Sequence, residues 1–144
     1  IYLFLSTTEG VIDMGLSMYL TGSIWKSFLD GEREKVEGYP VQRIEVSVGE
    51  WRKHRRLHGY IVKAFADGVD ECQKIELDAD ACRKIAKAVM DDALPPTEGF
   101  FFGNGEIDDI ERQEKEAHAK TFEDAANWID GKDWKYSLYY QASW

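Results

Sequence analysis

The residues best equipped for chemistry gather in one short stretch, 51-WRKHRRLHGY-60, which holds four Lys or Arg, two His and two aromatic residues. Arginine binds phosphates and carboxylates through paired hydrogen bonds, and Trp or Tyr rings stack on nucleic-acid bases. The same cations can also pair with the acids of a chain whose net charge is −9. The stretch therefore predicts either an anion-binding patch or a helix surface laced with ion pairs.

The candidate ligand- or partner-binding residues lie in this stretch, in the turn expected after it and in a later phenylalanine-rich segment. They are Trp51, Arg52, Lys53, Arg55, Arg56, His58, Asp70, Phe100 and Phe102. Arg52, Arg56 and His58 could bind an anion while the rings of 99-GFFFG-103 stack on a base, as in a nucleotide-sequestering protein. The alternative for 99-GFFFG-103 is packing at a sheet edge, because aromatic side chains are mostly buried.

The two histidines of the stretch, His54 and His58, are four residues apart, which is the spacing of two metal ligands on one helix. The sequence between them lacks the Glu of an HExxH motif, and Cys72 and Cys82 show no CxxC spacing. A third ligand, such as His118 or Cys72, would have to come from the fold. We therefore expect no metal and no cofactor, and we expect the histidines to be buried and hydrogen-bonded.

The common catalytic motifs do not occur in the chain. It contains no GxGxxG or GxxxxGK[ST] phosphate loop and no GxSxG nucleophile motif. An alternative with His58 as a general base beside Asp67 or Asp70 would make a His- or metal-dependent hydrolase. That alternative stays open, because a sequence gives residue types and not distances. A non-enzymatic protein is the leading expectation.

Composition and charge describe one soluble, globular domain. The 144 residues suffice for a single core, and apolar residues make up 44% of the chain. The net charge of −9 opposes general nucleic-acid binding, because phosphates need a basic surface. Two cysteines are too few for a disulfide framework, and 1-IYLFL-5 is too short to span a membrane. These features predict a cytoplasmic protein with reduced thiols and no membrane contact.

Acidic runs stand at 91–92, 106–116 and 123–124. Such runs could imitate a nucleic-acid backbone and occupy the basic groove of another protein. The alternative is a solubilising helix surface in which Glu111 pairs with Lys115 and Glu116 pairs with Lys120, one turn apart. We expect the second arrangement.

Strands are predicted where apolar residues alternate with polar ones. Alternation from Leu16 to Leu20 predicts a first strand, and alternation over 44–48 predicts a second that ends at Gly49. The charged residues, glycines and proline of 26–40 predict a loop or lid. A final strand is predicted over 134–144, and the residues sharing one of its faces are Trp134, Tyr136, Leu138, Tyr140, Ala142 and Trp144.

Helices are predicted where the spacing changes to three and four residues. That spacing continues from Trp51 to Phe65 and predicts a helix over 50–66, ended by 67-DG-68. Asp78 is the expected N-cap of a second helix that stops before Pro95. A third helix is expected from about residue 107 to Gly131.

This order of elements predicts an α+β fold, a single domain with a largely antiparallel sheet and about three helices packed on one face. The domain is expected to cover 14–144. The stretch 14-MGLSMYL-20 has the form of a natural beginning, so we expect residues 1–13 to be a leader or an N-terminal extension.

Several motifs resemble those of a family of small bacteriophage and prophage proteins. The motifs are 14-MGLSMYL-20, 51-WRKHRRLH-58, 67-DGVDEC-72, 94-LPPTEGFFFG-103 and 138-LYYQASW-144. The residues that match one by one are Trp51, Arg52, Lys53, His58, Cys72, Gly99, Phe100, Phe102 and Trp144. The family has Ala-Asn where this chain has His54-Arg55, so the additional basic charge is particular to this sequence. The resemblance covers almost the whole chain beyond residue 13, and it implies a phage origin without implying an activity.

The leading functional expectation is a small phage accessory protein that binds a host macromolecule, foremost a host protein, in the bacterial cytoplasm. The alternatives are a nucleotide- or phosphate-binding protein and the hydrolase described above. We also expect His58 to face inward and to be structural. Arg52 and Lys53 are expected to reach acids of 67–70, and Arg55 and Arg56 are expected to be ordinary surface residues.

Overall fold

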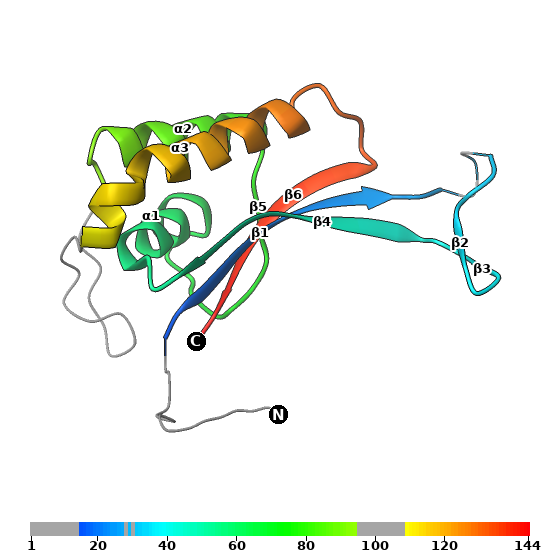
Figure 1. Ribbon diagram of the computed structural model, residues 1–144, viewed down its shortest axis with the longest axis horizontal. Coiled ribbons are helices and arrows are strands. Elements are labelled where there is room, and N and C mark those ends of the chain that lie inside the picture. Colours follow the sequence, from blue (N-terminus) through cyan, green and yellow to red (C-terminus); the bar gives the residue numbers. More distant parts are fainter. Residues whose placement is uncertain (1–14, 28, 30, 95–108) are drawn as a thin grey trace.

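A computed structural model of the chain describes residues 15–27, 29, 31–94 and 109–144. It shows an α+β fold in which helices cover one face of a four-stranded antiparallel sheet, as expected (Figure 1). The strands are β1 (Ser17–Trp25), β2 (Lys35–Val36), β3 (Tyr39–Pro40), β4 (Arg43–Arg52), β5 (Ile75–Glu76) and β6 (Tyr136–Ser143). The helices are α1 (Arg55–Phe65), α2 (Ala79–Met90) and α3 (Asp109–Ile129). Residues 1–13, Phe100 and Phe102, on which some expectations rest, lie outside the described residues.

Strand β1 is the centre of the fold. It pairs with β4 on one side and with β6 on the other, in the sheet order β4-β1-β6-β5. The predicted alternation is confirmed, because Leu16, Met18 and Leu20 are fully buried. On β6 the neighbouring residues Leu138 and Tyr140 are fully buried as well, so both strands turn one face to the core and the other face outward.

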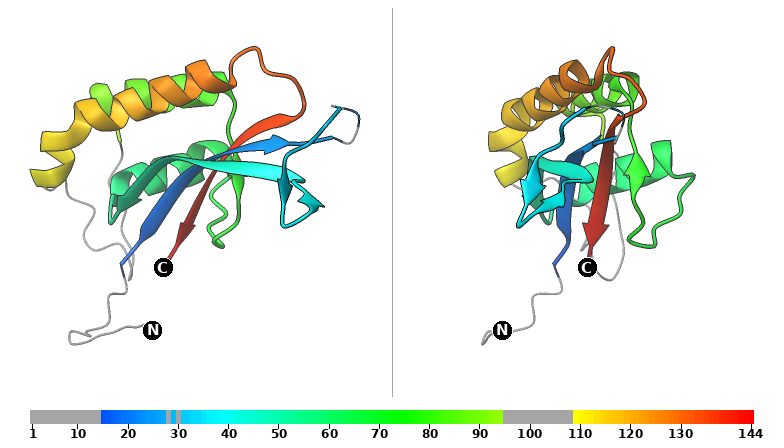
Figure 2. Two further views of the ribbon diagram at one scale, coloured as in Figure 1. Left: turned by 45° about the vertical axis from the view of Figure 1, so that its right-hand side comes forward. Right: turned by 90° about the vertical axis from the view of Figure 1, so that its right-hand side faces the viewer.

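The helices α2 and α3 lie side by side above the inner face of the sheet (Figure 2). Asp78 caps α2 as predicted, because its carboxylate accepts a hydrogen bond of 2.7 Å from the backbone N–H of Ala81. The expected core side of α2 is buried, with Cys82 and Ile85 fully enclosed. Phe122 of α3 is fully buried between this helix pair and the sheet.

Helix α1 begins later than predicted. The strand β4 continues through Trp51 to Arg52, and the chain then turns at Lys53, whose φ is 58°. His54 is the N-cap residue of α1, so the expected helix over 50–66 is wrong at its start. Its expected end is confirmed, since the backbone at 67–68 takes φ values of 53° and 79° and leaves the helix.

Residues 26–40, expected as a loop or lid, include the small hairpin β2–β3. Its turn is Glu37-Gly38 with φ of 49° and 87°, a pair of positive values that suits a tight two-residue turn. Figure 1 shows the hairpin projecting beyond the end of the sheet, away from the helices. We call residues 26–42 the arm.

Two further differences concern the ends of strands. Ile75 and Glu76 form the edge strand β5 against β6, which the sequence analysis did not predict. Trp134 was expected on the inner face of the last strand, but it precedes β6 and is 74% exposed. The rest of that face follows the prediction, because Leu138, Tyr140 and Ala142 are buried.

The sheet and α3 approach each other closely at two glycines. A Cβ atom on Gly49 would lie 2.8 Å from the Trp51 ring and 2.9 Å from Thr121 Cγ2. A Cβ atom on Gly22 would lie 2.8 Å from the ring of Trp128. The glycines therefore make room for the aromatic residues at the contact between strand and helix.

We predict that Gly49→Ala lowers the free energy of unfolding by about 1 to 3 kcal/mol, because the added methyl group would force Trp51 or α3 to move. Urea denaturation measures the change. The control is Ser47→Ala on the exposed part of β4, which should stay within about 0.5 kcal/mol of the unsubstituted protein. An unchanged denaturation midpoint for Gly49→Ala would show that α3 yields without cost.

Candidate functional site

His58 lies at the centre of a buried polar cluster. Its side chain is 2% exposed and projects from α1 toward β6. Its Nδ1 is 2.7 Å from the hydroxyl of Tyr140, and its Nε2 is 3.0 Å from both carboxylate oxygens of Asp70. The ring of Trp144 stands edge-on to the imidazole, with centroids 5.7 Å apart. We call Asp70, His58 and Tyr140 the His58 cluster.

Tyr140 is the most deeply buried member of the His58 cluster. Burial, and then the charge of Asp70, raise the pKa of the Tyr140 phenol well above its usual value. The phenol therefore keeps its proton. In the imidazole tautomer that donates Nε2–H to Asp70, the lone pair of Nδ1 accepts the hydrogen bond of this phenol. Each hydrogen-bonding group of the imidazole is thus matched to a partner.

This arrangement is poorly suited to general base catalysis. Asp70 stands beside His58 as the hydrolase alternative requires. The lone pair of Nδ1, however, accepts a hydrogen bond from a fully buried phenol and does not face an open space. The cluster instead joins three segments of the chain, namely α1, the turn after it and β6. The expectation that His58 faces inward is confirmed.

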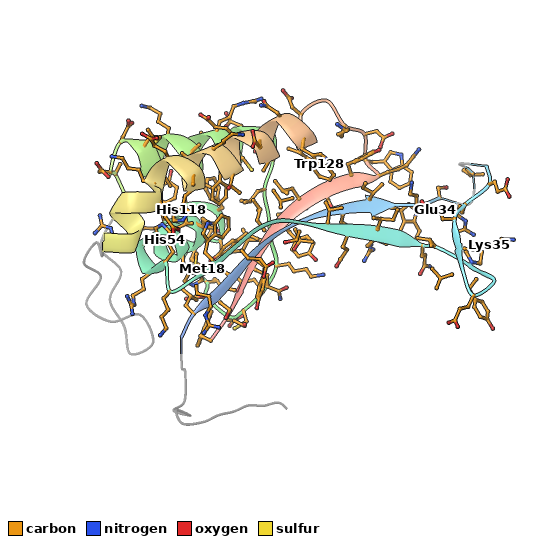
Figure 3. The ribbon with its side chains drawn as sticks, viewed as in Figure 1. Met18, Glu34, Lys35, His54, His118 and Trp128 are labelled. Carbon is orange, nitrogen blue, oxygen red and sulfur yellow. The ribbon has the colours of Figure 1, made fainter. Side chains whose placement is uncertain are left out.

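His54 faces a different set of partners. Its ring centroid is 4.8 Å from that of His118 on α3, and Figure 3 shows the two side chains facing each other. Trp51 stacks on Phe122 with centroids 5.2 Å apart and stands edge-on to His118. Glu114, one turn before His118, approaches the His118 Nε2 to 3.3 Å.

The two histidines of the basic stretch therefore belong to separate clusters, although they are four residues apart. The spacing alone suggested a shared face, but the ring partners of His54 lie on α3 and those of His58 lie on β6. Within the described part of the chain, no group of three or more His, Cys, Asp or Glu side chains is placed to hold a metal ion.

The basic residues of the stretch do not converge on one surface. Arg56 is buried and donates a hydrogen bond to the backbone carbonyl of Leu94, which follows α2. Its expected surface position is therefore wrong. The reason is that Arg56, in the first turn of α1, lies on the side of the helix from which its guanidinium reaches the carbonyl of Leu94, in the segment after α2. Arg52 and Lys53 are exposed at the end of β4, and Arg55 is half-buried.

Most of the residues that were expected to form an anion-binding pocket around the stretch at 51–60 therefore do not come together. Arg56 and His58 use their donors and acceptors inside the fold, while Arg52 belongs to a strand and not to the same helix. Phe100 and Phe102 lie outside the described residues. The contact of Arg52 and Lys53 with acids of 67–70 stays a prediction.

Acidic side chains on α2 and α3 form ion pairs with lysines, as expected for a solubilising helix surface. The pairs one helical turn apart are Lys84–Asp80, Lys87–Asp91 and Lys120–Asp124. Lys120 pairs with Asp124 and not, as expected, with Glu116. Lys115 reaches Asp92 after α2 at 3.0 Å, and the side chain of its expected partner Glu111 lies outside what the structure describes.

The structure also shows a groove that the sequence analysis missed. It lies across the outer face of the sheet and has a volume of about 420 Å³. Its lining residues are Ser23, Trp25, Arg43, Glu45, Lys74, Glu76, Trp134, Lys135, Ser137 and Tyr139. They come from four strands and two connecting segments, so no short sequence motif predicts the groove. We call this the outer groove.

Comparison with known proteins adds no relative: the chain matches no family model, no curated protein and no solved structure. In the part of the chain that the structure describes, no helix is both long and apolar enough to cross a membrane. The site must therefore be interpreted from its own geometry.

We predict that His58→Ala lowers the free energy of unfolding by about 1 to 3 kcal/mol, because a buried phenol would lose its acceptor and a buried imidazole its packing. Urea denaturation provides the measurement. The exposed Arg52→Gln serves as control and should change stability by no more than about 0.5 kcal/mol. If His58→Ala had no effect on stability and abolished a binding activity, the cluster would be functional and not structural.

We also predict that the two cysteines differ in reactivity. Burial, followed by the charge of Asp78, raises the pKa of the Cys82 thiol from 9.0 to about 12, whereas Cys72 is only half-buried. A thiol reagent at pH 8 should label Cys72 in the folded protein and reach Cys82 only on unfolding. Rapid labelling of Cys82 in the folded chain would contradict this assignment.

The pH dependence follows from the same shifts. Because the folded pKa of Cys82 and that of Tyr140 are raised, both groups favour the folded state while they are neutral. Their contribution is complete below pH 9 and is lost as the pH rises toward 12, since the unfolded chain ionises first. We expect the urea midpoint to fall over this range, and we expect Cys82→Ala to reduce the fall.

Proposed function

We propose that this chain is a small accessory protein that acts by binding another protein. A phage or prophage origin and a protein partner in the cytoplasm of a bacterial host are part of the proposal. It rests on the arm and on the way the buried polar residues are used.

The observation that carries the proposal is the apolar surface of the arm. Leu29, Val36 and Tyr39 are 79%, 62% and 77% exposed. Exposed apolar residues on a projecting hairpin are typical of a surface that another protein covers. A tyrosine at such a place offers a large ring with few rotatable bonds, which makes it an effective contact residue.

The charges around these residues suggest the chemistry of the partner. Between Leu29 and Tyr39 the sequence of the arm has four acids, Asp30, Glu32, Glu34 and Glu37, against the two cations Arg33 and Lys35. A polar rim with an excess of acid surrounds the apolar residues, and the whole chain has a net charge of −9. A partner with a basic surface would be attracted at long range and would bury the apolar residues on contact.

The use of the buried polar residues supports binding rather than catalysis. The imidazole of His58, the phenol of Tyr140 and the guanidinium of Arg56 hydrogen-bond inside the fold. Groups held in this way point into the fold and contribute to its stability. The nucleotide alternative, moved away from the stretch at 51–60, is supported by a separate observation on the outer groove.

The proposal is tested by affinity capture from lysates of several bacterial hosts with three baits. They are the unsubstituted protein, the double variant Val36→Gln with Tyr39→Gln, and the control Met90→Gln, which removes an exposed apolar side chain from α2. We expect one stoichiometric partner on the unsubstituted protein and on the control. Recovery on the arm variant should fall at least tenfold, since two central contacts are lost.

Two results would overturn the proposal. One is the absence of a stoichiometric partner from every host. The other is full recovery of the partner on the arm variant, which would place the contact elsewhere on the molecule. Circular dichroism and urea denaturation of the variant show whether the arm substitutions leave the domain folded.

A further inference from the structure

The outer groove forms where small side chains on the outer face of the sheet are flanked by large ones. Ser23 of β1 stands directly opposite Ser137 of β6, and these two small residues form its floor. Larger residues rise on either side, with Trp25 two positions along β1 and Tyr139 two positions along β6. The resulting volume of about 420 Å³ falls within the range of small-molecule sites.

The residues that line the outer groove have a net positive charge, whereas the whole chain has a net negative charge. The whole sequence has 27 acidic and 18 basic residues. The groove, by contrast, is lined by three cations, Arg43, Lys74 and Lys135, and by the two acids Glu45 and Glu76. Charges farther away are largely screened beyond about 10 Å at moderate salt, so a small ligand responds mainly to this local balance. The local balance favours an anionic group.

Two of the cations are held in place by aromatic rings. The guanidinium of Arg43 lies over Trp25, 5.7 Å from the ring centroid, and the ammonium of Lys74 lies 4.5 Å from the centroid of Tyr139. Tyr139 is itself fixed, because its hydroxyl donates to Glu45 at 3.1 Å. An arginine stacked on a ring still presents the edge of its guanidinium, which can bind a phosphate through two hydrogen bonds.

A stacking surface and hydrogen-bond acceptors complete the set. Trp134 stands at the rim of the groove and is 74% exposed, so its ring is accessible to a planar ligand. Glu45 and Glu76 can accept hydrogen bonds from exocyclic amino groups, and the floor adds the hydroxyls of Ser23 and Ser137. An aromatic base with an amino group and an attached phosphate matches these features together.

We propose that the outer groove binds a nucleotide, with the base on Trp134 and the phosphate near Arg43 and Lys74. This site is separate from the arm and goes beyond the proposed protein-binding function. The nucleotide comes either from the free pool or from the end of a single strand of nucleic acid, since both offer a base and a phosphate. A long nucleic acid is less favoured, because its many phosphates would meet the acidic remainder of the chain.

The test is a calorimetric titration of the full chain at low ionic strength. The probes are AMP, CMP, GMP and UMP, inorganic phosphate, a single-stranded oligonucleotide with a terminal phosphate, and an oligo-arginine peptide. We expect saturable binding of nucleotides, with UMP weakest because uracil lacks an exocyclic amino group. Phosphate alone should bind at least tenfold more weakly, because it cannot stack.

Variants locate the site. Trp134→Ala should weaken nucleotide binding about tenfold, and Arg43→Gln with Lys74→Gln should weaken it at least tenfold. The matched control, Lys84→Gln with Lys120→Gln, removes the same charge from exposed positions on α2 and α3 and should leave the affinity within about twofold. All of the substituted side chains are exposed, so equal urea midpoints show that the variants are folded.

The outcomes separate the possibilities. Tighter binding of the oligonucleotide than of any mononucleotide, lost in the same variants, supports the strand end as the source. Equal binding of phosphate and nucleotides overturns the proposal in favour of a simple anion site. Binding of the peptide alone, or of no probe, also overturns it. None of these results affects protein capture through the arm, so the two proposals can fail independently.

Discussion

The hydrogen bonds through the imidazole of His58 hold together parts of the chain that no helix or strand ladder connects. Nδ1 and Nε2 face opposite directions, so one ring can bridge Tyr140 on β6 and Asp70 in the turn after α1. Inside a core, an unmatched phenol or imidazole costs more than the net gain from either bond, so each partner depends on the others being in place. These hydrogen bonds, together with the buried Leu57 and Ile61, hold α1 against the sheet.

The contact between the sheet and α3 is arranged by side-chain size. Gly22 and Gly49 leave space on the sheet that the rings of Trp128 and Trp51 occupy. Trp51 can then stack flat on Phe122, at an interplanar angle of 3°. Hydrogen bonds between α1 and β6 and aromatic contacts between α3 and the sheet therefore hold the helices on the inner face. The outer face of the sheet takes no part in either, and none of the helices that the structure describes covers it (Figure 2).

The sequence predicted the elements whose side chains repeat with a clear period. Strand β1 and the cap of α2 fall into this group, because alternating apolar residues and an Asp before a helix act locally. The start of α1 was misplaced because Trp51 is three residues before His54, which fits a helix. The register shift opposite Leu20 and Thr21 breaks the alternation of β4 before Trp51, so the sequence pattern hides the last residues of the strand. The strands of two residues, β2, β3 and β5, are too short to show any period.

The candidate sites were harder to predict than the fold, because they depend on burial and on long-range strand pairing and not on a local pattern. The stretch at 51–60 drew attention by residue type, yet burial commits its His58 and Arg56 to the architecture. The outer groove is composed of residues unremarkable in the sequence, since Ser23 and Ser137 are 114 positions apart and meet only through the pairing of β1 with β6. A side chain can bind a ligand only where it is exposed to solvent. In a sheet, the strand register decides which side chains are exposed on the same face. In this protein, the register brings stacked cations, carboxylates and an exposed tryptophan together on the face that the core does not use.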